Sequence, residues 1–526
     1  MDSTEYNRVP YNTQALLSAH PDRLAALAVL FGMTPCPIRN SRILELGCGD
    51  GGNLIPIAYA LPQSEMVGID LAETAIAKGQ DMINRLGLKN IKLLHKNIME
   101  VDDNAGQFDY IIVHGIYSWV PQEVREKILS ICKNNLKRQG VAFVSYNTYP
   151  GWHLRGMCRD IMRFHAGHFQ EPEQKIMQAY AILKFTADAA PDSTRAYKQL
   201  LLQDVEHIEE IHPDRKNNYL IHDRLAEINQ PVYFHEFIAH AEKYNLKYLA
   251  ETNFSEMQDV FFAPDIRDML RKLSGSDIIV KEQYLDFITN RTLRKTLLCH
   301  ADVTLNRILH PKMMQNFYFS CPSRPVDENG VFLKDNLPAL VDRKDLRFQD
   351  SSGSVIDTDH LTIRAALLHL SHIWPHPLHF RELLNTAREL SPRPLEDDAI
   401  ALCDTLLSAI SGNMIEFHTH IPHFVREPGD YPTASLFVRE QIKAGSKVTS
   451  LCHRTIDLEN TYGMFLLPLL DGTRDRQTIQ KEMLELITLN NIPLNGKFPS
   501  EKTPDELVAE IDAELMNCAK YALLVR

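Results

Sequence analysis

The chain has 526 residues, and its 44% hydrophobic and 24% charged residues are ordinary for a folded protein. At roughly 150 residues per domain, this length predicts three or four domains. With 56 basic and 68 acidic residues the net charge is −12, so we expect no general electrostatic binding of nucleic acid. No apolar run approaches the ~18 residues of a membrane span, and the polar start lacks a secretion signal. These features predict a cytoplasmic protein without membrane insertion.

Nine cysteines are spread along the chain, and none of them forms a Cys-x-x-Cys pair. Their odd number and wide spacing argue against a disulfide framework and against a structural zinc site. We therefore predict no metal site.

The first 150 residues alternate short apolar runs with amphipathic stretches, which predicts repeated βα units around a parallel sheet. Pro121 begins a helix that we expect to run to about Leu136 and to end at Gly140. The predicted strands are residues 42–46, 66–70, 91–94, 108–113 and 141–145.

Long helical patterns replace this alternation from residue 152 to residue 228 and predict a helical insertion or lid. Apolar runs at 246–251 and 292–298 predict two strands that return to the first sheet. Residues 322–355 are rich in Pro, Asp, Asn, Gly and Ser, and we expect them to connect two parts of the chain.

Helical patterns followed by a strand, between Leu361 and His420, predict a winged-helix module. A similar succession recurs from Thr461 to the end and predicts a second one. The third helix of the first module, at 399–411, carries no Arg or Lys, so we expect no reading of DNA. The predicted domains are an N-terminal segment with the core (1–165), a helical insertion (166–230), a region completing the sheet (231–305), a connector (306–355), and winged-helix-like modules at 356–425 and 426–526.

A glycine cluster, ELGCGDGGN at residues 45–53, joins the first predicted strand to the first helix. Glycines let a backbone turn tightly and approach a ligand, and the helix start presents free N–H groups. Asp70 ends the second strand, where a carboxylate can accept hydrogen bonds from two ribose hydroxyls. Together these features predict a nucleoside site at the carboxyl edge of the sheet.

The cluster fits two templates. Gly47, Gly49 and Gly52 satisfy the dinucleotide fingerprint G-x-G-x-x-G. With Gly51 and an acid at Glu45, the cluster also satisfies the E-x-G-x-G-x-G loop of S-adenosylmethionine (SAM) methyltransferases. Glu45 favours SAM, because an acid there suits a sulfonium and ammonium ligand and would repel a pyrophosphate.

Later segments resemble class I methyltransferases, namely 108–113 followed by His114, and 136–141. Asn97 replaces the usual acid after the third strand and could still bind the adenine edge. The resemblance implies an α/β fold with a Rossmann-like core and a mostly parallel seven-stranded sheet, extended here by the helical insertion and the winged-helix-like modules.

Six further segments carry a closer resemblance, at residues 6–11, 20–25, 114–121, 146–152, 229–235 and 283–287. They resemble bacterial class I methyltransferases that bear a methyltransferase regulatory domain. That group includes the rickettsial protein-lysine methyltransferases acting on outer-membrane protein B. The resemblance covers roughly the first 300 residues and implies SAM as cofactor, but it does not specify the substrate.

Two groups of site residues follow from the strand ends, where ligands bind in such sheets. Aromatic and polar groups in the loops after strands four and five are candidates for the acceptor pocket, where aromatic burial favours a neutral lysine amine. These catalytic candidates are His114, Tyr117, Trp119, Asn147, Tyr149 and Trp152. The cofactor-binding candidates are Tyr11, Glu45, Gly47, Cys48, Gly49, Asp70, Leu71, Asn97, Ile98 and His114.

The leading hypothesis is a SAM-dependent protein-lysine methyltransferase whose substrate could be an outer-membrane protein. Methylation of a small molecule or RNA, or SAM binding without turnover by a regulator, stay open as alternatives. The helical insertion and the N-terminal segment could support a homodimer.

Overall fold

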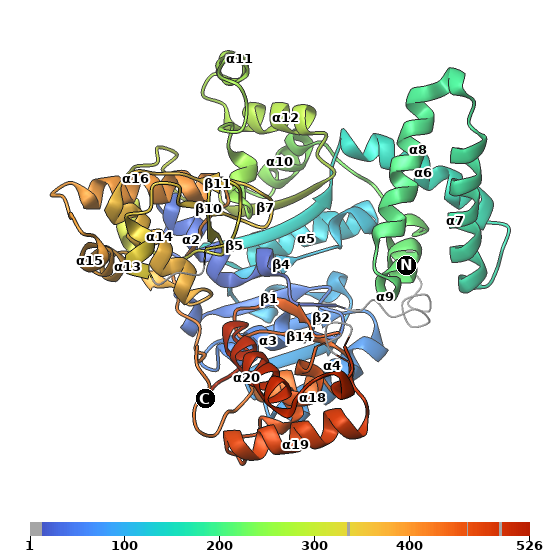
Figure 1. Cartoon of the computed structure of the whole chain (residues 1–526). Coiled ribbons are helices and arrows are strands. Elements are labelled where there is room, and N and C mark those ends of the chain that lie inside the picture. The colour runs from blue at the N-terminus through green and yellow to red at the C-terminus, as the bar shows by residue number, and fades with distance from the viewer. Residues whose placement is uncertain (1–12, 334–336, 460, 494–496) are drawn as a thin grey trace.

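The computed structural model describes residues 13–333, 337–459, 461–493 and 497–526. Its centre is a seven-stranded sheet in the order β3-β2-β1-β4-β5-β7-β6 (Figure 1). β7 runs antiparallel to both of its neighbours, whereas β1 to β5 are parallel, so their carboxyl ends share one edge. This confirms the mostly parallel seven-stranded core. The strands are β1 (Arg42–Leu46), β2 (Glu65–Asp70), β3 (Ile91–His95), β4 (Phe108–Val113), β5 (Leu136–Asn147), β6 (Leu246–Glu251) and β7 (Leu293–His300).

Strand β5 is longer than the sequence suggested. The helix before it, α5 (Gln122–Asn134), stops earlier than predicted, and Leu136 already pairs with Phe108 of β4. The role of Gly140 as a stop is therefore wrong, whereas the predicted helix end at about Leu136 is close to the observed end at Asn134. Gly140 lies inside the strand, where an added Cβ would come within 2.9 Å of the Asp109 carbonyl oxygen.

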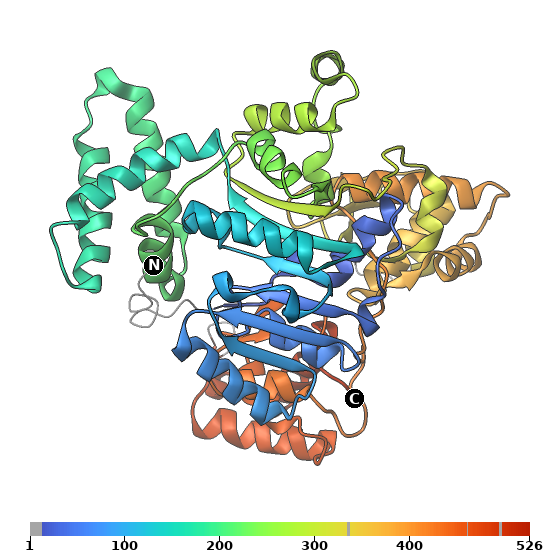
Figure 2. The ribbon, with the colours of Figure 1, turned by 180° about the vertical axis from the view of Figure 1, so that it is seen from behind.

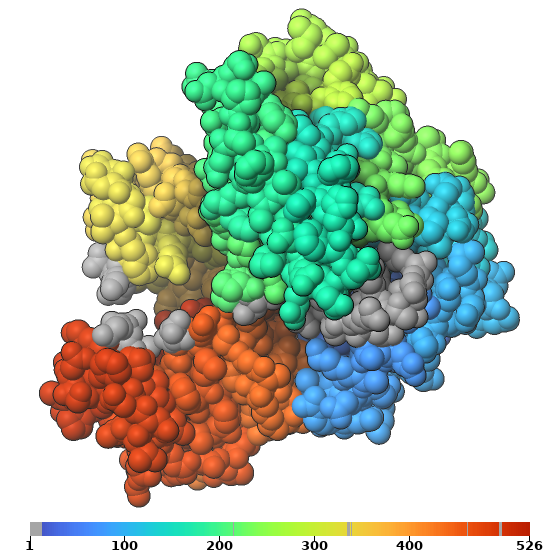
Figure 3. Space-filling model, turned by 90° about the vertical axis from the view of Figure 1, so that its right-hand side faces the viewer, coloured from blue at the N-terminus to red at the C-terminus, as the bar shows by residue number. Residues whose placement is uncertain are grey.

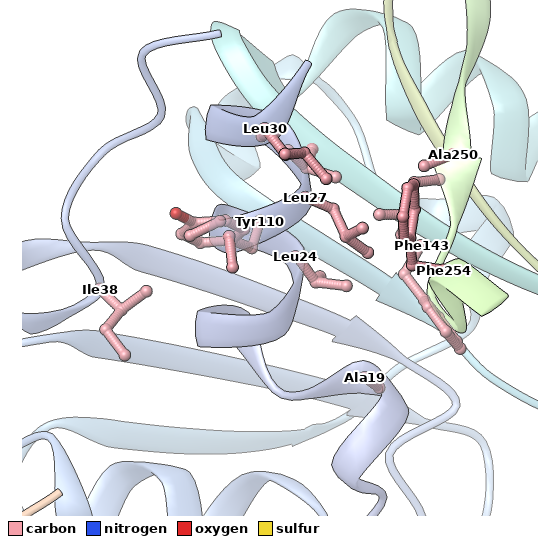
Figure 4. Close-up of a cluster of buried hydrophobic side chains, with 14 of the residues drawn as sticks. Ala19, Leu24, Leu27, Leu30, Ile38, Tyr110, Phe143, Ala250 and Phe254 are labelled. Atoms are coloured by element: carbon pink, nitrogen blue, oxygen red, sulfur yellow. The ribbon is translucent and has the colours of Figure 1, made fainter. Parts of the chain in front are cut away.

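Helices cover both faces of the sheet. On one face α2 (Pro21–Leu30) buries Leu24, Leu27 and Leu30 against Tyr110 of β4 and Phe143 of β5 (Figure 4). Apolar positions three apart on one helix face explain why this short, alanine-rich helix docks there. The core helices are α2 (Pro21–Leu30), α3 (Leu54–Ala60), α4 (Glu73–Leu86), α5, α10 (Phe234–Glu242), α11 (Pro264–Ser274) and α12 (Ile278–Thr289).

The helical insertion is a separate block with its own small hydrophobic core. It stands beside the sheet in Figure 1 and projects over the body of the molecule in Figure 3. A short π-helical segment (Tyr219–Arg224) leads back to the sheet. The helices are α6 (Gly151–Ala166), α7 (Pro172–Ala189), α8 (Arg195–Glu210) and α9 (Pro213–Asn218).

Residues 306–355, expected as connecting structure, contribute strands to two small sheets. β8 (Tyr318–Ser320) forms the centre of the sheet β12-β8-β13, and the other small sheet has the order β11-β10-β9. The elements of this region and of the predicted first winged-helix module are β8, β9 (Arg324–Val326), α13 (Leu337–Val341), β10 (Arg347–Gln349), β11 (Val355–Ile356), α14 (Leu361–Ile373), β12 (Leu378–His379), α15 (Phe380–Leu390), α16 (Asp398–Ser411) and β13 (Glu416–His418). Their buried residues belong to the same hydrophobic cluster as the central sheet.

The C-terminal module has its own hydrophobic core and packs against the β1–β3 end of the central sheet (Figure 2). At this contact Arg85 of α4 pairs with Glu440 at 3.1 Å, and the Leu436 N–H donates to the Tyr59 hydroxyl. Its elements are α17 (Leu436–Gln441), β14 (Lys447–Thr449), β15 (Thr455–Asp457), α18 (Gly463–Leu466), α19 (Arg476–Leu489) and α20 (Pro504–Lys520). Within the described residues, no helix is both long and apolar enough to cross a bilayer.

Candidate functional site

The glycine loop after β1 has the backbone geometry that only glycine adopts without strain. Gly47, Gly49 and Gly51 have φ angles of +75°, +55° and +78°. At Gly47 a Cβ would also come within 2.3 Å of the Ile116 side chain. The Gly47 N–H donates to the Ile69 carbonyl of β2 at 2.7 Å, so the loop is anchored to the neighbouring strand.

Asp70 holds this loop from the end of β2. One carboxylate oxygen accepts the Gly49 N–H at 2.7 Å, and the other accepts the Ala72 N–H at 2.8 Å. Each oxygen keeps a further lone pair that could accept a ribose hydroxyl. Leu71, the next residue, is 38% exposed at the same edge.

The start of the described chain lies on the glycine loop. The Thr13 hydroxyl accepts the Gly52 N–H at 2.8 Å and donates to Asp50. A Cβ on Gly49 would come within 2.4 Å of the Thr13 methyl group, so this close approach requires glycine. Tyr11, a predicted cofactor residue, lies outside the described residues.

Glu45 is buried at the end of β1 and is only 4% exposed. One carboxyl oxygen accepts the Asn53 amide N–H at 2.9 Å, while the other has no hydrogen-bond partner. Burial raises the pKa of Glu45 to about 8, because the hydrogen bond from Asn53 only partly offsets desolvation and Asp70 adds repulsion. At this pKa Glu45 is mainly protonated at neutral pH.

Other predicted cofactor residues line the same edge in different ways. Cys48 is buried, its Sγ packs close to Gly68, and burial raises its thiol pKa well above the usual range. Asn97 follows β3 and its side-chain oxygen accepts the Met99 N–H at 2.9 Å. Ile98 is half-buried beside it. The amide nitrogen of Asn97 is not used in that bond and could donate to an acceptor at this edge.

His114 follows β4 and lies 2.9 Å from the Ser145 hydroxyl, measured from its Nδ1. The same hydroxyl accepts the Gly115 N–H at 3.0 Å. Desolvation lowers the pKa of His114 to about 4, with a smaller contribution from the Lys295 charge. The ring is thus neutral at pH 7, so it can orient a polar group but is a weak base.

The loop after β5 is tied to the loop after β4 by amide hydrogen bonds. The Asn147 N–H donates to the Ser118 hydroxyl, and the Asn147 side-chain amide donates to the Asn229 side-chain oxygen, both at 2.9 Å. The Gln230 N–H in turn donates to the Ser118 carbonyl at 2.8 Å. Asn147 is held firmly and keeps its side-chain oxygen available.

Tyr117 is buried beneath this edge. Its hydroxyl lies 2.7 Å from His240 Nδ1, and its ring packs on Tyr146 and Phe237. Only 2% of its surface is exposed. The structure places Tyr117 in the core, where its contacts support the loop after β4.

The remaining aromatic candidates form two groups. Trp119 and Trp152 pack edge to face with ring centres 6.1 Å apart, and the buried Trp152 Nε1 has no hydrogen-bond partner. Tyr149 instead stacks on His153 at 4.1 Å and contacts Tyr233. The structure thus brings Trp119 together with Trp152 and places Tyr149 in a separate, partly exposed aromatic group.

Sequence reasoning missed several residues of this edge. Asn53 ends the glycine cluster, and the sequence gives it no role of its own. In the structure its side-chain amide donates to Glu45. Thr13 lies two residues after the candidate Tyr11, and this proximity in sequence is the feature that could have indicated it. Ser145 ends a predicted strand and Asn229 begins one of the segments that resemble the family, but neither position indicated these hydrogen bonds, because they join distant segments. No group of three or more His, Cys, Asp or Glu is arranged to hold a metal within the part of the chain that the structure describes.

Comparisons with known families assign three segments of the chain. A methyltransferase domain model matches residues 43–140, and a predicted methyltransferase regulatory domain model matches residues 216–300. A model of the C-terminal winged helix domain of PKMT matches residues 430–522. The second predicted winged-helix module is therefore confirmed, whereas the first one stays a prediction.

One relative and one solved structure match nearly the whole chain, and a second relative matches about half of it. The uncharacterized protein RP789 of Rickettsia prowazekii is 33% identical over 518 residues, which is 97% of this chain and 91% of that protein. RP028 of the same organism is 38% identical over 244 residues, 46% of this chain and 96% of that protein. The structure of PKMT2 from Rickettsia typhi in complex with AdoHcy superposes with a TM-score of 0.86 at 29% identity, covering 98% of this chain and 100% of that one.

Proposed function

Because the chain belongs to the family of class I SAM-dependent methyltransferases with a methyltransferase regulatory domain, we propose that it methylates lysine side chains of a protein substrate. The observation that carries this proposal is the whole-chain likeness to PKMT2 from Rickettsia typhi, including the C-terminal winged helix domain. The substrate could be an outer-membrane protein, as for the rickettsial enzymes that the sequence resembles.

In this proposal the methyl donor SAM binds along the carboxyl edge of β1 to β4. Asp70 accepts the ribose hydroxyls, and the backbone at Gly47 and Gly49 allows close approach. Glu45 faces the cationic methionine end. Cys48, Leu71, Asn97 and Ile98 surround the nucleoside, and Tyr11, outside the described residues, stays a candidate for the methionine moiety.

The acceptor lysine approaches from the loops after β4 and β5. Its amine has a pKa of about 10.4, so presenting it neutral at pH 7 costs about 4.6 kcal/mol without help from the pocket. Aromatic surfaces such as the Trp119–Trp152 pair lower that cost by desolvation. Neutral His114 and the free oxygen of Asn147 orient the amine for in-line attack on the methyl carbon. Tyr117 supports this loop from the core, while Tyr149 contributes an aromatic wall.

The helical insertion is the proposed dimerisation region. Phe164, Met177 and Phe185 are 81%, 59% and 66% exposed on α6 and α7, which is unusual for such large apolar side chains. A second copy covering this face would bury them. The nine free cysteines suit a reducing compartment and support a cytoplasmic location.

Cofactor binding is tested by titration calorimetry with S-adenosylhomocysteine (AdoHcy), the demethylated form of SAM. Asp70→Ala should weaken binding at least ~100-fold, because two charge-assisted hydrogen bonds to the ribose are lost. Glu73→Ala, an exposed acid on the following helix, should bind like the wild type. A folded wild-type protein that binds neither SAM nor AdoHcy would refute the proposal.

The lysine acceptor is tested with tritiated SAM and host extracts. Label should appear in protein, and mass spectrometry should place added methyl groups on lysine. Label found only in RNA or in small molecules would instead support the alternative methyltransferase activities.

A further inference from the structure

The turn between β14 and β15 carries a histidine from the C-terminal module into the methyltransferase core. His453 is 4% exposed and has a φ of +57°, a left-handed conformation that a non-glycine residue adopts at some cost. Its N–H donates to the Ser450 carbonyl at 2.9 Å, which closes the turn. The imidazole ring lies 4.9 Å from the ring of His20, just before α2.

The partner of His453 in the core is Asn53, the residue that precedes α3. The Asn53 side-chain oxygen lies 2.9 Å from His453 Nε2 and accepts the Leu16 N–H at 3.0 Å. A backbone N–H can only donate, so the atom facing Leu16 is the amide oxygen. The amide nitrogen of Asn53 therefore faces Glu45, to which it donates at 2.9 Å.

This orientation fixes the proton on His453. The Asn53 oxygen can only accept, so His453 Nε2 must carry the hydrogen and donate it. Burial lowers the pKa of His453 well below its ordinary value, which leaves a neutral ring with a single N–H. That N–H is directed at the amide that holds Glu45.

We propose that His453 is a positioning residue for SAM binding, which acts from the C-terminal module through Asn53 on Glu45. The inference rests on the proposed function, because Glu45 matters only if SAM binds beside it. In the resulting chain of contacts the His453 N–H orients the Asn53 amide, and the Asn53 amide orients the Glu45 carboxyl. The C-terminal module thereby completes the cofactor site, over a separation of 400 residues between His453 and Asn53.

The neighbouring residue in the same turn strengthens this assignment. Arg454 pairs with Glu416 of β13 and lies over the Trp374 ring at 5.7 Å. The turn is thus held in place by the middle of the chain, independently of His453. Loss of the imidazole alone should leave the turn docked while removing the contact to Asn53.

The test compares full-length variants by titration calorimetry with SAM and by steady-state kinetics. His453→Ala should raise the Kd and the KM for SAM by about 5- to 20-fold with little change in kcat, as expected for one buried hydrogen bond. His453→Gln, whose side-chain amide can also donate to Asn53, should restore the affinity to within about 3-fold of the wild type. Cys452→Ala, the matched control in the same turn, should bind like the wild type.

A double-mutant test with Glu45 distinguishes a positioning role of His453 from a role in packing alone. In a Glu45→Gln background, adding His453→Ala should weaken SAM binding by less than about 2-fold, because the carboxylate that it positions is already absent. The inference would be overturned if His453→Ala bound SAM as tightly as the wild type, or if His453→Gln lost as much affinity as His453→Ala. It would also be overturned if His453→Ala caused its full loss of SAM affinity in the Glu45→Gln background. Failure of the wild type itself to bind SAM would instead refute the proposed function.

Discussion

At the residue scale, the most informative side chain is Glu45, because its protonation state should change when a cationic ligand binds beside it. The folded protein raises its pKa from 4.5 to about 8, so the carboxyl holds its proton at neutral pH. As the pH rises from 4.5 to 8, the unfolded chain releases this proton first, and the contribution of Glu45 to stability falls across that window. A cationic ligand beside Glu45 reverses this preference by stabilising the carboxylate.

SAM affinity should therefore rise with pH up to about 8, by at most tenfold per unit, because binding to protonated Glu45 must release its proton. Glu45→Gln cannot ionise, and its SAM affinity should be nearly independent of pH in this range. Calorimetry in buffers of different ionisation enthalpy measures the released proton directly. A wild-type affinity that stays constant from pH 6 to 8 would contradict this assignment.

At the scale of elements, β6, β7 and α12 are joined by a buried ionic cluster. Arg294 on β7 is fully buried and contacts Glu251 of β6 at 2.8 Å, with Glu282 at 3.1 Å and Asp286 at 2.8 Å on α12. Burial raises the pKa values of Glu282 and Asp286, while the surrounding acids raise that of Arg294 against its own desolvation. Arg294 thus ties α12 to the strands β6 and β7, and Arg291 adds a second contact to Asp286 at 3.1 Å.

Arg294→Met should destabilise the protein by about 3–5 kcal/mol, because it removes the cation that three buried carboxylates share. Urea unfolding monitored by circular dichroism measures the change. The matched control is Arg271→Ala on α11, whose ion pair with Asp268 is exposed on both sides and should contribute less than about 1 kcal/mol. A similar small effect for both variants would show that the buried cluster does not stabilise this junction.

For the whole molecule, neutral histidines lie where three parts of the chain meet. His20 precedes α2, His420 follows β13, and both have their pKa lowered to about 4, mainly by desolvation. They line a cavity of about 80 Å³ together with Arg454 from the C-terminal module. Charging them would place cations in this desolvated junction.

Low pH should reduce the folding stability that this junction provides. Between pH 6.5 and 4, His20 and His420 bind protons in the unfolded chain but stay neutral in the folded protein. Their contribution to folding stability is therefore complete above pH 6.5 and is lost as the pH falls to 4. The two pKa shifts correspond to about 3 kcal/mol each. The melting temperature should fall from pH 7 to pH 5, and His20→Asn should reduce the slope, whereas exposed His310→Asn should not. Equal slopes for wild type and His20→Asn would argue against this origin.

The sequence by itself determined the methyltransferase core, because its signals are local. Alternating apolar runs mark β1 to β4, and the glycines at positions that require positive φ mark the ligand loop. Asp70 could be located because strand ends in a parallel sheet meet at one edge. The start of β5 was predicted too late, at residue 141, because Leu136 pairs with Phe108, a partner 28 residues away in sequence.

Only the tertiary structure decided how the site is completed. Tyr117 was predicted as an acceptor residue from its position in a loop, but packing against Tyr146 and Phe237 turns it into the core. His453 carries no local pattern at all, and its role depends on how the C-terminal module docks onto the glycine loop. Periodicity and turn chemistry report on neighbours along the chain. Contacts across hundreds of residues are set by the packing of separate hydrophobic cores, which no local pattern encodes.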